Sequence, residues 1–283
     1  MQQSNLWQLD NYNAPITALF DVGIYEYDIS KANISVLADA GKISEDQYLI
    51  MFNMPREDRQ VIVGLMQRTD PQVGDILKEG FCNARHKLFD ILNLEDNNVL
   101  HVNKDAVFVV KRLSDTAIAH TDFIPISSHV EFTLRSKFST YFRIGPSIHF
   151  YYDYDLVAGK DVHKIRGMSE ESQKLHEVNF TSLLDNIFRA QQISGFAAAY
   201  NLCKDYYNDL MCGKLPAADY GRRFDNSSEF DIRYDSIFGT MRAEYLSENT
   251  SAYVDPSYNL QILANLGNVL LSYMMMYGNS NSL

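Results

Sequence analysis

The sequence predicts an α+β fold in which an antiparallel sheet is followed by a helical second part. Runs of β-branched and aromatic residues recur between residues 20 and 152, and the short turn signals between them favour antiparallel neighbours. From Glu170 onward, apolar residues recur at helical spacing over long segments. We therefore expect one domain over residues 1–168 and a helical subdomain over residues 169–283.

The first strand and the helix after it are expected between residues 20 and 41. The segment FDVGIYEYDI is rich in β-formers and ends near Asp28, after which Ser30 is expected to cap a helix. Gly41 suits the left-handed position that ends such a helix. The next helix is expected to begin at Ser44, which forms a capping-box pattern with Gln47.

A helical insertion is expected over about residues 42–98, between the first strand and the rest of the sheet. Besides the helix after Ser44, it contains periodic segments over residues 56–68 and 71–93. Asp70 and Pro71 are typical of a helix start, because Asp caps the N-terminus and Pro fits the first helical position.

The sheet resumes at residue 99. The segment VLHVNKDAVFVVKRL places two β-branched runs around the polar group Asn103–Asp105, which predicts a tight hairpin. Further strands are expected over residues 129–135, 138–144 and 147–152, giving a sheet of about five strands.

The second part is expected to consist of helices. Periodic segments cover residues 172–193 and 197–212, and a shorter helix is expected after Pro216. The apolar stretch 260–277 contains several Asn, Gln and Ser residues that would be costly in lipid, so it predicts a packed terminal helix.

Cysteine, histidine and N-terminal patterns indicate a protein of a reducing compartment. The three cysteines are an odd number without CxxC spacing, and the first residues lack the pattern of a signal peptide. The histidines show no spacing typical of a zinc site. We expect a cytoplasmic location, in the bacterial host if the gene is a phage gene, and no membrane partner.

The net charge of −11 disfavours nucleic-acid binding over most of the surface, because phosphates are bound by Lys and Arg. The charge is uneven, however. Residues 104–166 contain nine Lys or Arg and seven Asp or Glu, while the flanking parts are acidic. A nucleic-acid surface is therefore expected in that middle stretch.

Two aspartates are the candidate catalytic residues. Asp28 is at a predicted strand end and Asp105 at a predicted hairpin turn, so antiparallel pairing would bring their carboxylates together. Paired carboxylates from different elements can hold the divalent cations used in phosphoryl transfer, here Mg²⁺ or Mn²⁺. Each residue also has a purely structural explanation, since Asp is common at helix caps and in tight turns.

The same two segments resemble motifs of DNA polymerases. DISKANISVLA at Asp28 resembles motif A, and LHVNKDAVFVV resembles motif C of the family B polymerases and, more distantly, the family A motifs. Motif C has Asp, any residue, Asp at its tip. Here Asn103 replaces the first Asp, and Asp105 matches the second. The segment from residue 197 to 224 is similar to the family B thumb.

The resemblance implies a polymerase-type palm and assigns roles to further residues. Asp28, Ile29 through its carbonyl, and Asp105 would bind metal. Asn33, five residues after Asp28, would contact the ribose, and its small side chain would admit ribonucleotides. Cations of the helical insertion would bind the triphosphate, and the candidates are Arg68, Lys78 and Arg85. The residues expected to contact the primer and template are Lys104, Arg135, Lys137, Tyr141, Lys164 and Arg166.

The function that these features predict is that of a metal-dependent nucleotidyltransferase, a DNA or RNA polymerase without a proofreading domain. The Lys-containing fingers helix of the family B polymerases, with its Asn-Ser and Tyr-Gly signature, is not found in the sequence. The expected partners are a primer–template, nucleoside triphosphates and a protein that supplies the missing fingers or a basic surface. A phage or mobile-element origin suits the small size. Two alternatives stay open: an inactive palm acting as an accessory or scaffold protein, and an ordinary α+β binding domain that matches the motifs by chance.

Overall fold

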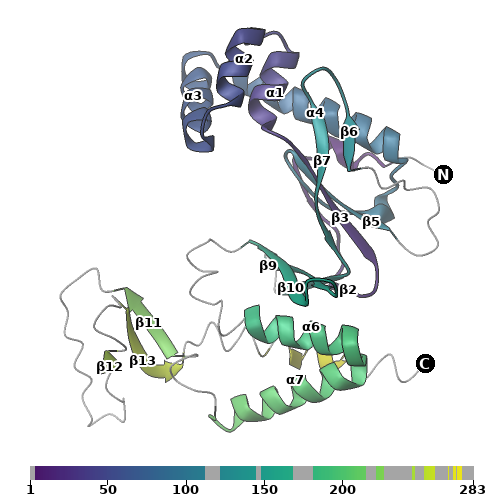
Figure 1. Cartoon of the computed structure of the whole chain (residues 1–283), viewed down its shortest axis with the longest axis vertical. Helices are drawn as coiled ribbons and strands as arrows, with labels where there is room; N and C mark the ends of the chain where they lie inside the picture. The colour runs from purple at the N-terminus through teal and green to yellow at the C-terminus, as the bar shows by residue number, and fades with distance from the viewer. Residues whose placement is uncertain are drawn as a thin grey trace. The chain divides into compact units, whose positions relative to one another are not determined.

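The chain folds as an α+β protein with antiparallel sheets, which confirms the predicted fold class at this level. The computed structural model describes residues 4–111, 122–144, 148–167, 181–214, 221–225, 244–245, 252–258, 267, 270–271 and 273–275. These residues belong to two compact units, Met1–Ser139 and Thr140–Leu283 (Figure 1). The units divide before the predicted boundary at residue 168, because the three strands that follow Ser139 pair with one another in the second unit.

The first unit is built on a six-stranded sheet with the order β1-β4-β5-β3-β7-β6, in which all neighbours are antiparallel. Strand β3 is central and carries the predicted motif A aspartate at its end. The bounds are β1 (Asn11–Asn13), β3 (Gly23–Ile29), β4 (Val99–Asn103), β5 (Ala106–Lys111), β6 (Phe123–Pro125) and β7 (Glu131–Phe138), with the short β2 at Ala18–Leu19.

The helical insertion is present between β3 and β4 as predicted. The helices are α1 (Ala32–Asp39), α2 (Glu45–Phe52), α3 (Arg56–Thr69) and α4 (Gln72–Leu92), and the short 3-10 turns are Leu6–Gln8 and Asp96–Asn98. The capping box of α2 is confirmed: Ser44 and Gln47 each accept a hydrogen bond from the other's backbone N–H, at 3.3 and 2.8 Å. The cap expected at Ser30 is wrong, because Lys31 occupies that position in a left-handed conformation (φ 52°).

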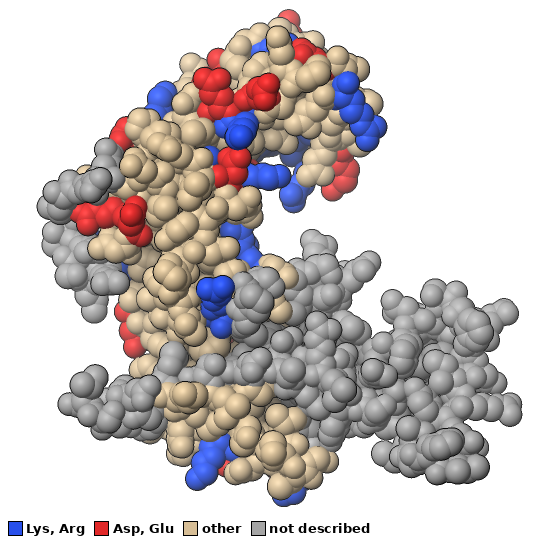
Figure 2. All heavy atoms as spheres, turned by 180° about the vertical axis from the view of Figure 1, so that it is seen from behind, with Lys and Arg blue, Asp and Glu red and all other residues tan. Residues whose placement is uncertain are grey.

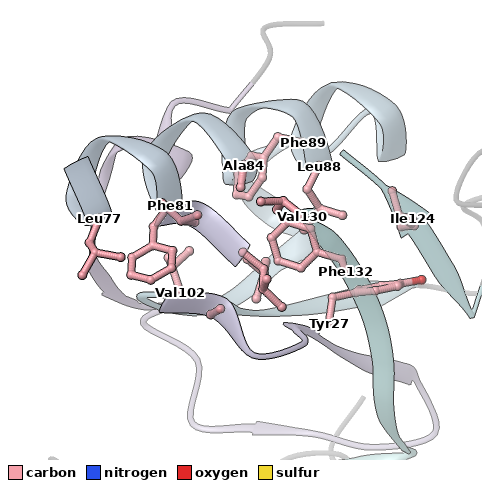
Figure 3. Packing of buried hydrophobic residues seen from close by; sticks show 14 of the residues in the cluster. Tyr27, Leu77, Phe81, Ala84, Leu88, Phe89, Val102, Ile124, Val130 and Phe132 are labelled. Atoms are coloured by element: carbon pink, nitrogen blue, oxygen red, sulfur yellow. The ribbon is translucent and has the colours of Figure 1, made fainter. Parts of the chain in front are cut away.

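Helix α4 covers one face of the sheet and forms the core with it (Figure 3). Phe81, Leu88 and Phe89 of α4 are buried, as are Tyr27 and Phe132 of the sheet. Side chains alternate between the two faces of a strand. Because Tyr27 and Ile29 belong to this core, Asp28 between them projects from the opposite face.

The second unit contains strands as well as helices. Strands β8 (Thr140–Ile144), β9 (Ile148–Asp155) and β10 (Lys160–Arg166) form an antiparallel sheet, and Phe188 of α6 stacks on Phe150 of β9 with ring centroids 5.7 Å apart. Helices α6 (Ser182–Ser194) and α7 (Phe196–Met211) contact each other.

The part of the chain after residue 169, where helices were expected, also contains strands. Strands β11 (Gly221–Asp225), β12 (Glu244–Tyr245) and β13 (Ala252–Tyr258) form a small antiparallel sheet in the order β11-β13-β12. The described residues of the terminal stretch, 267, 270–271 and 273–275, are helical as predicted, whereas the helix expected after Pro216 falls outside the described residues. Within the described parts of the chain, no helix combines the length and apolar character needed to cross a membrane.

A buried histidine should make the stability of the chain depend on pH. His149 of β9 lies with its Nδ1 2.9 Å from the Tyr141 hydroxyl. Burial, with smaller contributions from Arg143 and Arg166, lowers the pKa of His149 from 6.5 to about 4. The unfolded chain therefore binds a proton between these two pH values that the folded chain does not bind.

We expect the free energy of unfolding to fall as the pH is lowered from 7 to 4.5, by roughly 1 to 3 kcal/mol from this residue. Urea denaturation at several pH values measures it. His149→Gln should flatten this part of the pH profile, and an unchanged slope in that variant would contradict the assignment.

Candidate active site

An open pocket of about 510 Å³ lies where β3 ends and where α1 and α3 begin. The two predicted catalytic aspartates are among the residues that line it. Figure 2 shows Lys and Arg side chains next to Asp and Glu side chains on the hollowed side of the first unit. The full lining consists of Asp28, Ile29, Ser30, Lys31, Ala32, Asn33, Ile34, Arg56, Arg59, Gln60, Val63, Asp105 and Arg135.

Strand pairing brings Asp28 and Asp105 to the same pocket. Asp28 of β3 is paired with Ala106 of β5, so Asp105 directly precedes the partner of Asp28. The backbone N–H of Ile29 also donates to the Asp105 carbonyl at 3.3 Å. Within the described residues, no three His, Cys, Asp or Glu side chains gather as a metal-binding group. A metal site here would therefore depend on these two carboxylates and on backbone or nucleotide oxygens.

The turn that carries Asp105 is fixed by a buried arginine. Arg85 of α4 is fully buried, and it donates hydrogen bonds to the Lys104 carbonyl, to the Trp7 carbonyl at 2.8 Å and to Asp10 Oδ1 at 3.0 Å. The backbone N–H of Lys104 donates to the Asp10 carbonyl at 2.7 Å. The prediction that Arg85 binds nucleotide is therefore contradicted, because its guanidinium is used to hold the hairpin turn.

A bulge in β7 directs Arg135 to the pocket. Glu26 and Tyr27 of β3 pair with Ser136 and Leu134, so Arg135 is an extra residue between them. Such bulges change the direction of a side chain. Arg135 Nε lies 3.7 Å from Asp28 Oδ2, and the two side chains are 47% and 31% exposed, so the pair itself contributes little to stability.

The basic residues of the helical insertion that reach the pocket are not the predicted ones. Arg56 and Arg59 of α3 line it, together with Gln60 and Val63, because these positions share one helix face. The sequence signal that could have identified Arg56 and Arg59 is their helical spacing from Val63, the buried residue of α3. Arg68 lies at the other end of the helix and lines a different groove.

Lys78 and Lys31 differ from the prediction in other ways. Lys78 is exposed on α4 and does not line the pocket. Lys31, which was not predicted, lines the pocket while its Nζ donates to the Phe52 carbonyl at 2.6 Å and lies over the Phe52 ring. Desolvation by burial, with a smaller contribution from Arg59, lowers the pKa of Lys31. Lys31 thus ties α2 to the edge of the pocket.

The residues predicted to contact a primer and template divide between the two units. In the first, Lys104 is exposed in the hairpin turn, and Lys137 is exposed on β7 two residues after Arg135. In the second, Lys164 and Arg166 lie two residues apart on β10, so they share one face of that strand.

The role predicted for Tyr141 is contradicted by its burial. Its side chain is fully buried on β8, its hydroxyl lies beside His149, and burial raises its pKa to about 12. Lys137 and Tyr141 lie on different strands, because β7 ends at Phe138 and a new strand begins at Thr140.

The fold and pocket define an α+β protein in which two aspartates from neighbouring antiparallel strands meet a group of basic side chains. The chain belongs to the Bacteriophage PBS1 gene 130 protein family, whose model matches residues 1–272. A comparison with curated proteins finds no match. The family associates the chain with a bacteriophage.

Replacing Arg85 tests whether it is structural. In Arg85→Met the carbonyls of Trp7 and Lys104 lose their donor inside the protein, so we expect a loss of about 2 to 4 kcal/mol in the free energy of unfolding. Denaturant unfolding measures it, with Lys78→Met on the exposed side of the same helix as the control. Equal stability of the two variants would contradict the structural role.

Proposed function

We propose that this protein is a metal-dependent nucleotidyltransferase of the nucleic-acid polymerase type, with a palm-like sheet and a thumb-like second unit. The observation that carries the proposal is that Asp28 and Asp105, the two residues that resemble the motif A and motif C carboxylates, line one pocket. A chance resemblance in two segments so far apart in the sequence gives no reason for their side chains to meet.

The oxygen donors of the pocket suit Mg²⁺ or Mn²⁺. Asp28, Asp105 and the carbonyl of Ile29 would hold the cation, since hard divalent ions prefer carboxylate and carbonyl oxygens and keep several water ligands. When bound, such a cation activates the attacking hydroxyl and neutralises charge on the phosphates. The protein's own contribution is to hold both carboxylates at the ends of paired strands, so that they need no rearrangement.

The basic side of the pocket suits the phosphates of a nucleoside triphosphate. Helices α1 and α3 both begin there, and among the described residues neither N-terminus is capped by a side chain. A helix N-terminus favours anions, and Arg56 and Arg59 add full positive charges. The lining contains four Lys or Arg and two Asp, so the pocket is locally basic although the chain has a net charge of −11.

Other pocket and surface residues would contact the ribose and the primer–template. Asn33 lines the pocket and would contact the ribose. Arg135, Lys137 and Lys104 would contact a primer–template along the first unit, and Lys164 and Arg166 would do so from the second. We place the activity in the cytoplasm of the bacterial host, together with a partner protein that supplies the missing fingers.

One observation favours a second candidate, an inactive palm that acts as an accessory or scaffold protein. Arg135 lies 3.7 Å from Asp28, so a guanidinium already neutralises one of the two carboxylates. In an active enzyme, Arg135 would move to a phosphate oxygen when the cation binds Asp28. In an accessory protein it would stay where a cation would otherwise bind.

Incorporation of labelled nucleotides on a primed template, with Mg²⁺ or Mn²⁺, tests the proposal. Asp28→Ala and Asp105→Ala should each reduce incorporation by at least about a thousandfold, because each removes a metal ligand. Their thermal transitions should stay within a few degrees of the wild type, since both side chains are at the pocket surface and not in the core.

Asp58→Ala is the matched control, because Asp58 is an exposed aspartate near the start of α3 that does not line the pocket. It should retain full incorporation. Retained activity in either Asp28→Ala or Asp105→Ala would refute the assignment, and no incorporation by the wild type under any condition would favour the accessory protein.

A further inference from the structure

Helix α3 has a second surface that faces away from the pocket. Val63 is the one residue of this described helix that is buried, whereas Val61 and Leu65 are 62% and 52% exposed. They line a shallow groove of about 460 Å³ that is formed by α3 alone. In Figure 1 the helix lies at the edge of the helical part of the first unit. Val61 and Leu65 are four residues apart on the helix, so their exposed side chains form one continuous apolar strip.

The groove is flanked by two rows of side chains spaced four residues apart. One row is Glu57, Val61 and Leu65, and the other is Gln60, Gly64 and Arg68. Rows of this kind are the ridges that interlock when two helices pack. Val61 is the raised centre of the first row. Gly64 leaves a notch at the centre of the second row, and a Cβ added there would meet nothing within 4 Å in this chain.

The two rows complement each other under a two-fold rotation. If a second α3 lies antiparallel, with the axis passing between Ile62 and Val63, the first row of one copy meets the second row of the other. Val61 then faces Gly64, Gln60 faces Leu65, and the acidic Glu57 faces the basic Arg68. Every contact occurs twice, as an isologous interface requires.

We propose that the chain forms a symmetric dimer through this face of α3. The charge complementarity of Glu57 and Arg68 and the match of Val61 to the Gly64 notch identify a second copy as the partner. A helix of 14 residues is about 21 Å long, and one helix pair buries less than the roughly 1,200 to 2,000 Å² of a stable interface. The dimer is therefore weak, and its formation depends on protein concentration.

Dimer formation would also hold the helix that carries Arg56 and Arg59. Gln60 lines both the groove and the candidate active site, so the two surfaces adjoin along α3. A second copy would add contacts to a helix that packs against its own chain through Val63 and the partly buried Ile62 and Met66. The dimer proposal does not depend on the protein being an enzyme, because both the polymerase and the accessory protein would need an ordered α3.

Sedimentation velocity of the full chain over roughly 2 to 200 µM at low salt tests the dimer. The wild type should shift from monomer toward dimer with rising concentration. Glu57→Arg and Arg68→Glu should each weaken the dimer by at least about tenfold, because each places like charges opposite one another twice. The double variant restores opposite charges, and its Kd should return to within about threefold of the wild type.

Gly64→Leu tests the notch. It should abolish the dimer while the thermal transition stays the same or rises, because Leu is a better helix former than Gly and meets no atom of its own chain. Lys78→Glu, a charge reversal of an exposed side chain on α4, is the control and should leave the dimer unchanged. A monomer at all concentrations, larger oligomers, or a dimer that is insensitive to the charge reversals would overturn the proposal.

Discussion

The buried guanidinium of Arg85 holds together three segments on which the pocket depends. It joins α4 to the segment containing Trp7 and Asp10 and to the hairpin turn at Lys104. A buried cation is costly unless its hydrogen bonds are satisfied, and here each nitrogen that donates has a defined acceptor. The turn therefore has one favourable position relative to the helix layer. That position brings Asp105 beside the end of β3, where Asp28 lies.

The same pocket brings carboxylates and a larger number of basic side chains together. Asp28 and Asp105 come from the sheet, Arg135 comes from a bulge in the sheet, and Arg56 and Arg59 come from α3. The guanidinium of Arg135 lies beside the carboxylate of Asp28. A cation together with a polyphosphate would satisfy both signs at once, since the metal binds the carboxylates and the phosphates bind the arginines. The cation alone would leave the arginines without an anionic ligand, and the polyphosphate alone would leave the two carboxylates without a cation.

The features that the sequence predicted correctly are those that a few adjacent residues determine. The capping box at Ser44, the strand ending at Asp28 and the two-residue hairpin turn before Ala106 follow from a few adjacent residues, and the structure contains all three. That Asp28 and Asp105 line one pocket follows from strand pairing. Arg85 lies four residues after Phe81 and three before Leu88, on the buried face of α4, and this spacing was the sequence signal that it is structural. Tyr141 was misjudged because the alternation of side chains along a strand does not show which of its two faces is buried.

The central claim is that Asp28 and Asp105 form one cation site, and Mn²⁺ binding followed by electron paramagnetic resonance tests it most directly. Free Mn²⁺ loses its sharp signal when it binds, so a titration gives the affinity without requiring catalysis. We predict one class of site in the wild-type chain, with affinity reduced at least about tenfold in both Asp28→Asn and Asp105→Asn. Binding that is absent from the wild type, or unchanged in either variant, would contradict the account.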